Sequence, residues 1–416
     1  MTTNWSGTYD YRSARRERPA TVAELQQLVA DAPAVKVAGS GHSFNGIADS
    51  ESGWQLDVSG LITPPEIDPD SGIVTVSGGM KYGELVPALA TSGRALPNLA
   101  SLPHITIAGS VATGTHGSGV RQPGLSSAVR AVELLTADGE LRWIDATDPR
   151  FDGVVVSLGA LGVVTRVRLA TVPDYAVRQD AFIGLSWGEL VGRIGEVLAA
   201  SYSVSVFGRW VGTGPDHVIV KSVVGHEDRT PFLPGASWTP DTLHPLQAAG
   251  ATPDAVTEQG GVPGPWADRL PHFRLGFTPS AGAEIQSEFF VAAEDAGRGI
   301  EGLLAVGDAI APHLLVSEIR AIASESQWLS PAHGRDSVAF HFTWKPDLDA
   351  VRQAVGIVQQ ALSDLAPRPH WGKVFTYPGR LDFAYARLDD FDDLRRMLDP
   401  QGKFRNEFVT RHVARA

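Results

Sequence analysis

One turn near the N-terminus limits the folds open to this chain more than any other feature. An apolar run at residues 35–38 leads directly into Gly39-Ser40-Gly41, and His42 follows. Glycines at such a turn allow backbone N–H groups to approach a phosphate closely, because no Cβ stands between them. A histidine at the same point adds a nucleophilic imidazole. The pairing predicts a loop that holds a phosphate-bearing cofactor and tethers it covalently, although a plain turn beside a structural histidine has the same residues.

A second loop, residues 101–119, is rich in glycine, serine and threonine and contains His104 and His116. Backbone amides and hydroxyl groups in a run of this kind can surround a pyrophosphate. Two loops of this type in one segment are hard to explain as ordinary turns. A nicotinamide-binding Gly-x-Gly-x-x-Gly turn is disfavoured, because Phe44 occupies the place of the third glycine.

The two loops together resemble the FAD-binding domain of the vanillyl-alcohol oxidase family, in which the histidine of a Gly-His-Ser turn often bonds to the flavin 8α-methyl group. Residues 317–320, 370–375 and 399–408 resemble the sugar-alcohol branch of that family, the alditol oxidases, so the similarity spans nearly the whole chain. It implies an α+β, two-domain fold of the PCMH type. We expect an FAD-binding α+β domain at residues 1–172, a substrate-binding cap of antiparallel sheet flanked by helices at 173–370, and a C-terminal segment at 371–416 that returns to the FAD domain.

The resemblance also implies site residues, by their positions in the matching motifs. Those implied in FAD binding are Val37, Ala38, Gly39, Ser40, Gly41, His42, Ser43, Ser101, Thr106, Gly109, Ser110, Thr113, Gly114, Thr115, His116, Val164 and His370. His42 would carry the covalent bond to FAD, and no metal is expected. Arg320, Lys373 and Glu318 would be catalytic and would also bind substrate. Ser101, Gln286, His341 and Thr343 would complete the substrate site.

The implied reaction is hydride transfer from the terminal C1 carbinol of an alditol, such as xylitol or sorbitol, to FAD, with O2 reduced to H2O2. Cations near the substrate oxygen favour alkoxide character, which is the role expected of Arg320 and Lys373. Glu318 would orient Arg320 and bind a hydroxyl group. A lysine beside a fixed arginine has a lowered pKa, so Lys373 is either a general base or an electrostatic stabiliser. Ala100, beside Ser101, is the residue expected to gate oxygen access.

Three stretches of the expected cap alternate polar and apolar side chains, which places their polar groups on one face of each strand. These are residues 284–290 with Glu284, Gln286 and Glu288, 316–322 with Glu318 and Arg320, and 337–344 with His341 and Thr343. A sheet with one solvated face shows the same alternation. A solvated face is usually rich in Lys, Glu and Thr, however, whereas this one offers paired donors and acceptors suited to vicinal hydroxyl groups. The pattern favours the floor of a polyol pocket.

Local periodicity predicts the remaining elements. Helical spacing is found at residues 21–32, 82–90, 190–199, 302–311 and 351–362, and strand-like runs at 73–76 and 163–167. A hairpin is expected from 129–135 and 141–144, because a turn sequence lies between them. Residues 230–279, rich in Pro, Gly and Trp, predict irregular packed loops.

Composition limits the class of protein. A chain of 416 residues is long enough for two domains, and a net charge of −12 argues against a nucleic-acid partner. No apolar run approaches the roughly 20 residues of a membrane helix, and no signal peptide is visible, so we expect a cytoplasmic protein with no membrane partner. The absence of cysteine excludes a cysteinyl-flavin bond. We expect a monomer whose partners are a small polyol and O2.

Three alternatives stay open at this point. The nearest is an aldonolactone oxidase or dehydrogenase on the same fold, because the motif at residues 399–408 is shared across that wider group. A hydrolase built on Ser, His and Asp is disfavoured by the lack of a Gly-x-Ser-x-Gly elbow. A non-catalytic module that binds polyol or flavin would use Arg320 and Lys373 for affinity alone.

Overall fold

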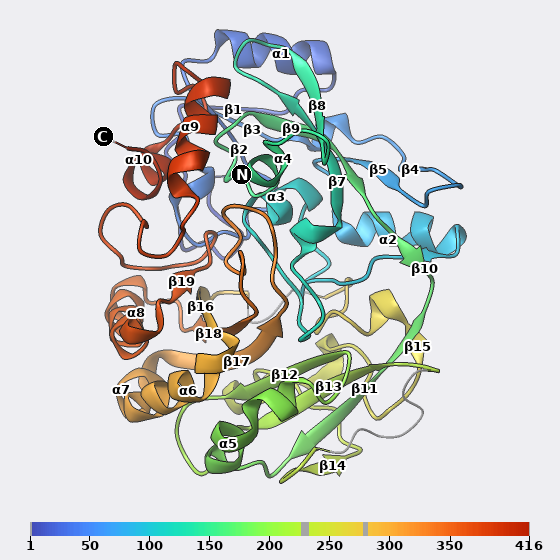
Figure 1. Cartoon of the computed structure of the whole chain (residues 1–416), viewed down its shortest axis with the longest axis vertical. Helices are drawn as coiled ribbons and strands as arrows, with labels where there is room; N and C mark the ends of the chain where they lie inside the picture. The colour runs from blue at the N-terminus through green and yellow to red at the C-terminus, as the bar shows by residue number, and fades with distance from the viewer. Residues whose placement is uncertain (1, 226–232, 278–281, 416) are drawn as a thin grey trace.

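The computed structural model describes residues 2–225, 233–277 and 282–415. Two large sheets lie one above the other along the long axis of the molecule (Figure 1). The upper part contains the N-terminal residues together with the C-terminal helices, and the lower part contains the middle of the chain. The α+β fold predicted from the sequence is confirmed.

The upper part is built on a five-stranded antiparallel sheet in the order β4-β5-β9-β7-β8. Its strands are β4 (Glu66–Ile67), β5 (Val74–Ser77), β7 (Val129–Leu135), β8 (Leu141–Asp145) and β9 (Val163–Leu169). A parallel sheet beside it contains β1 (Arg15–Glu17), β2 (Val35–Val37) and β3 (Trp54–Leu56), and β6 (Arg94–Ala95) pairs with β10 (Val172–Pro173). The helices of this part are α1 (Val22–Asp31), α2 (Tyr82–Thr91), α3 (Ile107–Ala112), α4 (Phe151–Val155), α9 (Leu388–Leu398) and α10 (Glu407–His412).

The lower part is built on a nine-stranded sheet in the order β14-β11-β13-β12-β17-β18-β16-β19, with β15 paired to β11. Its strands are β11 (Ala176–Ile183), β12 (Ser203–Gly208), β13 (His217–Val223), β14 (Ser237–Thr239), β15 (Gly264–Pro265), β16 (Ile285–Ala292), β17 (Leu314–Ile322), β18 (Ser337–Trp344) and β19 (Arg368–Pro369). Helices α5 (Trp187–Leu198), α6 (Ala296–Ala305), α7 (Gly307–Ile310) and α8 (Leu348–Ala361) pack on its outer side (Figure 1). Buried apolar side chains of these helices and of the sheet form one core.

Short 3₁₀ turns complete the described chain. They are η1 (Gly46–Ala48), η2 (Val58–Leu61), η3 (Leu125–Ala128), η4 (Gln247–Ala249), η5 (Pro253–Ala255), η6 (Trp266–Asp268), η7 (Ala293–Asp295), η8 (Ala311–His313) and η9 (Ser363–Leu365). Turns η4 to η6, with the short strands β14 and β15, account for much of the region predicted to be irregular. Residues 230–232 and 278–279 of that prediction lie outside the described residues.

Helix boundaries follow from local chemistry. Helix α1 begins after Thr21, whose hydroxyl accepts a hydrogen bond from the backbone N–H of Glu24 at 3.1 Å. The predicted helix at 302–311 is wrong as a single element, because the backbone leaves helical geometry at Val306 and restarts as α7. A Cβ at Gly307 would lie 1.9 Å from the carbonyl oxygen of Trp210, so the chain packs too closely there for any other residue.

The register of the large sheet aligns polar residues from three strands. Glu288 of β16 pairs with His341 of β18, which pairs in turn with Glu318 of β17. Directly paired residues of antiparallel strands share a face. The three side chains therefore form one row across the sheet, although they come from strands that are well separated in sequence.

The last residues of the chain hold the first loop in place. The amide Nδ2 of Asn406 donates to the carbonyl oxygens of Gly46 and Asp49 at 2.9 and 2.8 Å. The backbone N–H of Val35 donates to the carbonyl oxygen of Lys403 at 2.7 Å. The motif at residues 399–408 therefore fixes the chain on both sides of the glycine turn at residues 39–41. The exact limits of the domains stay a prediction.

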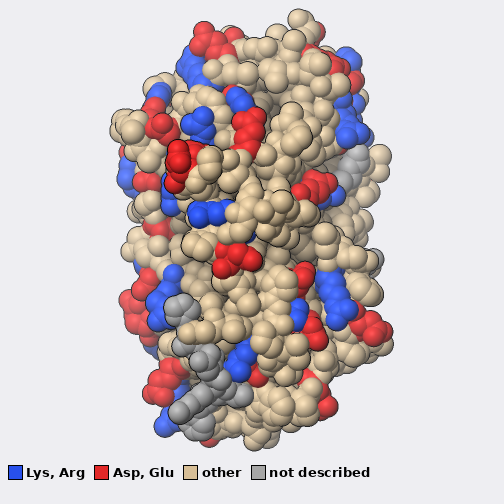
Figure 2. Space-filling view, turned by 90° about the vertical axis from the view of Figure 1, so that its right-hand side faces the viewer, with Lys and Arg blue, Asp and Glu red and all other residues tan. Residues whose placement is uncertain are grey.

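Charged side chains are scattered over the mostly uncharged face shown in Figure 2, where Lys and Arg often lie next to Asp and Glu. The net charge of −12 is therefore not gathered into a single acidic area on that face. Among the described residues, no helix is long and apolar enough to cross a membrane.

Candidate active site

A cavity of about 800 Å³ lies where the glycine-rich loops meet the polar row of the large sheet. Residues 37–43 and most of 100–116 line it from the upper part, and β16, β17 and β18 line it from the lower part. All but one of the site residues predicted from the sequence line this cavity. The exception is Gly114, which packs against Pro331 instead, with a Cβ position 2.8 Å from the proline ring.

Two glycines make the first loop possible. A Cβ at Gly39 would lie 2.1 Å from Thr106 Oγ1, so only glycine fits between the two loops. Gly41 has a φ of +72°, a conformation that other residues rarely adopt. The backbone N–H of Thr106 donates to Ser40 Oγ at 3.3 Å and joins the loops directly.

The imidazole of His42 lies against the ring of Trp5, with the ring centroids 4.8 Å apart and the planes 14° from parallel. Both of its nitrogens are buried, and neither has a hydrogen-bond partner of normal geometry among the residues that the structure describes. The nearby Ser40 backbone raises the pKa of the ring, but this effect is smaller than that of burial. Burial lowers the pKa of His42 to about 4. The ring is thus neutral at physiological pH and keeps an unshared electron pair. Trp5 was missed by the sequence reasoning, because a stacking partner so far away in the chain leaves no local signal.

These features fit a dinucleotide such as FAD. Where Gly39 packs against Thr106 there is no room for a Cβ, so the first loop presents only backbone groups at this point. Buried polar atoms of four cavity-lining residues, Tyr11, His42, His104 and Ser157, have no hydrogen-bond partner among the described residues. Buried polar groups are normally satisfied, so a bound molecule that supplies partners explains them.

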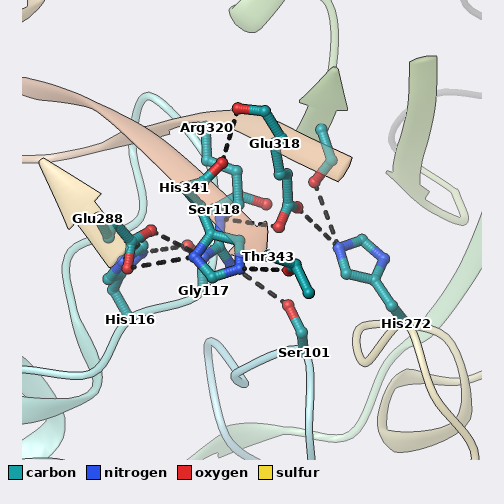
Figure 3. A network of polar contacts seen from close by, with 12 residues as sticks. Ser101, His116, Gly117, Ser118, His272, Glu288, Glu318, Arg320, His341 and Thr343 are labelled. Atoms are coloured by element: carbon teal, nitrogen blue, oxygen red, sulfur yellow. Dashed lines mark hydrogen bonds and ion pairs between the residues drawn. The ribbon is translucent and has the colours of Figure 1, made fainter. Parts of the chain in front are cut away.

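Glu288 is the centre of the charged end of the cavity. Its oxygens lie 2.7 Å from Lys373 Nζ, 3.1 Å from an Arg320 guanidinium nitrogen and 3.2 Å from His116 Nε2. Figure 3 shows this carboxylate between groups from different elements. Burial would raise the pKa of Glu288, but Lys373, His116 and Arg320 outweigh it and hold that pKa well below its usual range. Glu288 is therefore a fixed anion.

Arg320 joins the two halves of the substrate site. One of its terminal nitrogens donates to Ser101 Oγ at 3.2 Å, and its Nε lies 3.4 Å from a Glu318 oxygen. Although burial lowers the pKa of Arg320, its two carboxylate neighbours outweigh burial and raise that pKa overall, so the guanidinium stays charged. Burial also raises the pKa of Glu318, but Arg320 and His272 reverse the effect and lower it.

Lys373 lies beside His341 at the same end of the cavity. Its Nζ donates to Glu288 Oε2 at 2.7 Å and to His341 Nδ1 at 2.8 Å. Burial lowers the pKa of Lys373, and it lowers the pKa of His341 to about 3. The neutral His341 ring then donates from Nε2 to Thr343 Oγ1 at 3.2 Å. Gln286, which pairs with Thr343 in the sheet, lines the same wall.

One residue of the expected FAD set, His116, makes its contacts at the charged end of the cavity, and its place beside the FAD diphosphate stays a prediction. His116 was expected beside the FAD diphosphate, but its Nε2 faces Glu288 and its Nδ1 faces the carbonyl oxygen of Gly117 at 2.7 Å. Its ring belongs to the charged end, 6.2 Å from the ring of His370. Glu288 itself was placed on the polar face of its strand by the sequence, yet its central position was missed, because the alternation identifies a face and no partners.

A cavity with two glycine-rich loops on one side and a charged antiparallel sheet on the other defines an FAD-linked oxidoreductase. A model of the FAD binding domain matches residues 15–145, and a model of D-arabinono-1,4-lactone oxidase matches residues 306–412. The alditol oxidase of Streptomyces sp. is 46% identical over 410 residues, which are 98% of this chain and 97% of that protein. The chain belongs to the alditol oxidase family of FAD-dependent oxidoreductases.

Lactone-oxidising enzymes are more distant relatives. The L-gulono-1,4-lactone dehydrogenase of Mycobacterium tuberculosis is 29% identical, and the similarity covers 98% of both chains. The L-gulonolactone oxidase of Bos taurus is 24% identical over 98% of this chain and 96% of its own. The family predicted from the sequence motifs is thus confirmed.

Proposed function

We propose that this protein oxidises the terminal C1 carbinol of alditols such as xylitol and sorbitol to the aldose, with FAD bound covalently at His42 and O2 reduced to H2O2. The observation that carries the proposal is the cluster of ion pairs formed by Glu288, Arg320, Lys373 and Glu318 at one end of the cavity. The similarity to an alditol oxidase along the whole chain supports the same substrate class. The monomeric state and the cytoplasmic location stay predictions.

The polar wall suits a chain of hydroxyl groups. Carboxylate oxygens of Glu318, the amide of Gln286 and the hydroxyl groups of Ser101 and Thr343 all line the cavity. A polyol buried there needs a partner for each hydroxyl, because an unmatched buried polar group costs about 1–3 kcal/mol. The alternating donors and acceptors of this wall can supply such partners.

FAD, when bound, supplies the hydride acceptor and passes the electrons to O2. The protein must then take the hydroxyl proton and stabilise negative charge on the C1 oxygen. Arg320 is the permanent cation, held by two carboxylates. Lys373 takes the proton as a neutral amine, because its two N–H donors are engaged by Glu288 and His341 and its electron pair is left for the substrate.

The site argues against a serine hydrolase. In the described structure, the Ser101 hydroxyl contacts the Arg320 guanidinium, a donor that cannot remove its proton. A lactone substrate is the stronger rival, since the lactone enzymes share the fold. A lactone ring, however, presents fewer free hydroxyl groups to the polar wall than an open-chain alditol of equal carbon number.

The test is oxygen consumption by the purified flavoprotein with xylitol, sorbitol and L-gulono-1,4-lactone. We expect turnover with the alditols and at least a hundredfold smaller kcat/KM with the lactone. Lys373→Met should lower kcat at least a hundredfold, whereas Lys345→Met, at an exposed lysine just beyond β18, should leave it unchanged. Preferential oxidation of the lactone would contradict the proposal.

A further inference from the structure

A second chain of polar groups lies behind Glu318, on the side away from Lys373. Lys221, on β13, is 2% exposed, and its Nζ contacts the carbonyl oxygen of Leu270 and lies 3.3 Å from His272 Nδ1. The other ring nitrogen of His272, Nε2, lies 2.9 Å from Glu318 Oε1. Figure 3 shows the His272 ring directed at Glu318. The reaction described above uses neither Lys221 nor His272.

The neighbours of His272 leave it one tautomer. Nε2 faces a carboxylate oxygen, which only accepts, and a more distant Ser205 hydroxyl at 3.5 Å, whereas Nδ1 faces the Lys221 amine, which can donate in either charge state. Nε2 must therefore carry the proton and donate to Glu318. Burial lowers the pKa of His272 to about 4, so the ring is neutral at pH 7.

The backbone of His272 contacts the opposite wall of the substrate site. Its N–H donates to the carbonyl oxygen of Ser101 at 3.1 Å, and the N–H of Phe273 adds a longer bond to the same oxygen at 3.3 Å. The residue before His272 is fixed by a buried hydrogen bond, in which Thr257 Oγ1 donates to the carbonyl oxygen of Pro271 at 2.6 Å. Gln179 of β11 donates to that Thr257 hydroxyl at 2.8 Å. His272 thus touches a substrate residue of each half, and buried hydrogen bonds fix its own position.

We propose that His272, oriented by Lys221, is a positioning residue that holds the Glu318 carboxylate for the alditol and couples it to Ser101 across the cavity. The proposal rests on the function proposed above, which makes Glu318 and Ser101 substrate ligands. By this reasoning, a neutral N–H donor keeps Glu318 ionised and leaves its second oxygen to Arg320 and the substrate. Lys221 acts only through the ring of His272.

The charges around Glu318 set the expected pH dependence. It is faced by Arg320 of its own strand, by His341 of β18 and by His272, with Lys221 of β13 behind that ring. Loss of the His272 donor removes one of the interactions that lower the pKa of Glu318. Protonation of Glu318 gives kcat/KM an acidic limb that is separate from the rise caused by deprotonation of Lys373 and lies at lower pH, and loss of the His272 donor moves this acidic limb to higher pH.

A first experiment reads the tautomer without any substrate. The flavoprotein is labelled with ¹⁵N-histidine, and His272→Gln identifies the signal of His272 by its disappearance. We expect the Nε2–H tautomer from pH 5 to 9 both in the wild-type protein and in Lys221→Met, with a shifted Nδ1 signal in the variant because the amine no longer donates to that nitrogen. An Nδ1–H tautomer, or a protonated ring at pH 7, would overturn the proposal. Because no turnover is measured, this result stands even if the proposed substrate class is wrong.

A second experiment measures kcat and KM for xylitol against pH. His272→Ala should lower kcat/KM at least tenfold, mostly through KM, and move its acidic limb to higher pH. His272→Gln, which keeps an N–H donor, should restore part of both effects. His217→Phe is the matched control, since that buried ring stacks on Phe207 and neither of its nitrogens has a hydrogen-bond partner within the described part of the chain. An acidic limb that stays in place in His272→Ala, or that moves equally in His217→Phe, would show that His272 only fills space.

Discussion

Glu288→Gln removes a charge from the centre of the site while it keeps the shape of the side chain. The Glu288 oxygens lie 3.1 Å from the Arg320 guanidinium and 2.7 Å from Lys373 Nζ. At an effective dielectric constant of about 20, unit charges about 3 Å apart attract by about 5 kcal/mol. In the wild-type protein the cost of removing both charges from water offsets much of that attraction. In Glu288→Gln the Arg320 guanidinium stays buried and charged, so the attraction is lost while the cost of burying Arg320 remains.

The size of the loss follows from what Arg320 retains. Removing one partner of a buried ion pair costs about 3–5 kcal/mol. Arg320 still has Glu318 at 3.4 Å and the Ser101 hydroxyl at 3.2 Å, so we expect the lower end of that range, about 3 kcal/mol.

Urea unfolding of the flavoprotein at pH 7 measures this loss, followed by the fluorescence of buried tryptophans such as Trp210 and Trp344 in the cap core. Glu140→Gln is the control, because Glu140 forms an exposed ion pair with Arg142 that contributes less than about 1 kcal/mol. If Glu288→Gln changed the free energy of unfolding no more than the control does, the charges of the cavity would be screened by solvent. The electrostatic account of the site would then be refuted.

Three further predictions concern the cofactor, the proton and the stability. In His42→Ala, acid precipitation should leave the flavin in the supernatant, whereas flavin that stayed in the wild-type supernatant would contradict the tether. The kcat/KM of the wild-type enzyme should rise with pH as Lys373 loses its proton. In Glu288→Gln this rise should move to lower pH, because the carboxylate that raises the pKa of Lys373 is gone. A kcat/KM that falls with increasing pH would exclude Lys373 as the base. Burial lowers the pKa of Lys36 from 10.5 to about 7. Between pH 7 and 10.5 Lys36 is therefore protonated in the unfolded chain and neutral in the folded protein, so the free energy of unfolding should rise with pH in this range. Lys36→Met should flatten that rise in urea unfolding, and an unchanged slope would show that Lys36 does not cause it.

Local signals in the sequence were enough to identify both walls of the cavity. The glycine turn with His42 and the hydroxyl-rich second loop depend on backbone conformation, which a few adjacent residues determine. The alternation in β16, β17 and β18 depends on the period of two residues along a strand, which is equally local. For the same reason, the amino-acid sequence was enough to place Glu318, Arg320, His341 and Thr343 on the cavity face.

Interruptions and partners could not be predicted in this way. The helical spacing at 302–311 continues past Ala305, where α6 ends, and two residues later Gly307 packs against the backbone of Trp210, which is distant in the chain. The residues around His116 in the sequence are typical of a loop that binds a diphosphate. Its ring nonetheless contacts the Glu288 carboxylate from the opposite wall of the cavity. Each of these outcomes depends on a residue that is distant in the chain.

By itself, the sequence determined the fold class, the family, the cofactor loops and the polar face of the cap strands, since these rest on local periodicity and on motifs. Only the tertiary structure decided which charges meet. The register of β16, β18 and β17 brings Glu288, His341 and Glu318 into one row, and packing of the whole sheet sets that register. Burial of Lys373 and His272 beside that row then lowers their pKa values, because the cost of desolvation depends on everything packed around a group and on no short stretch of sequence.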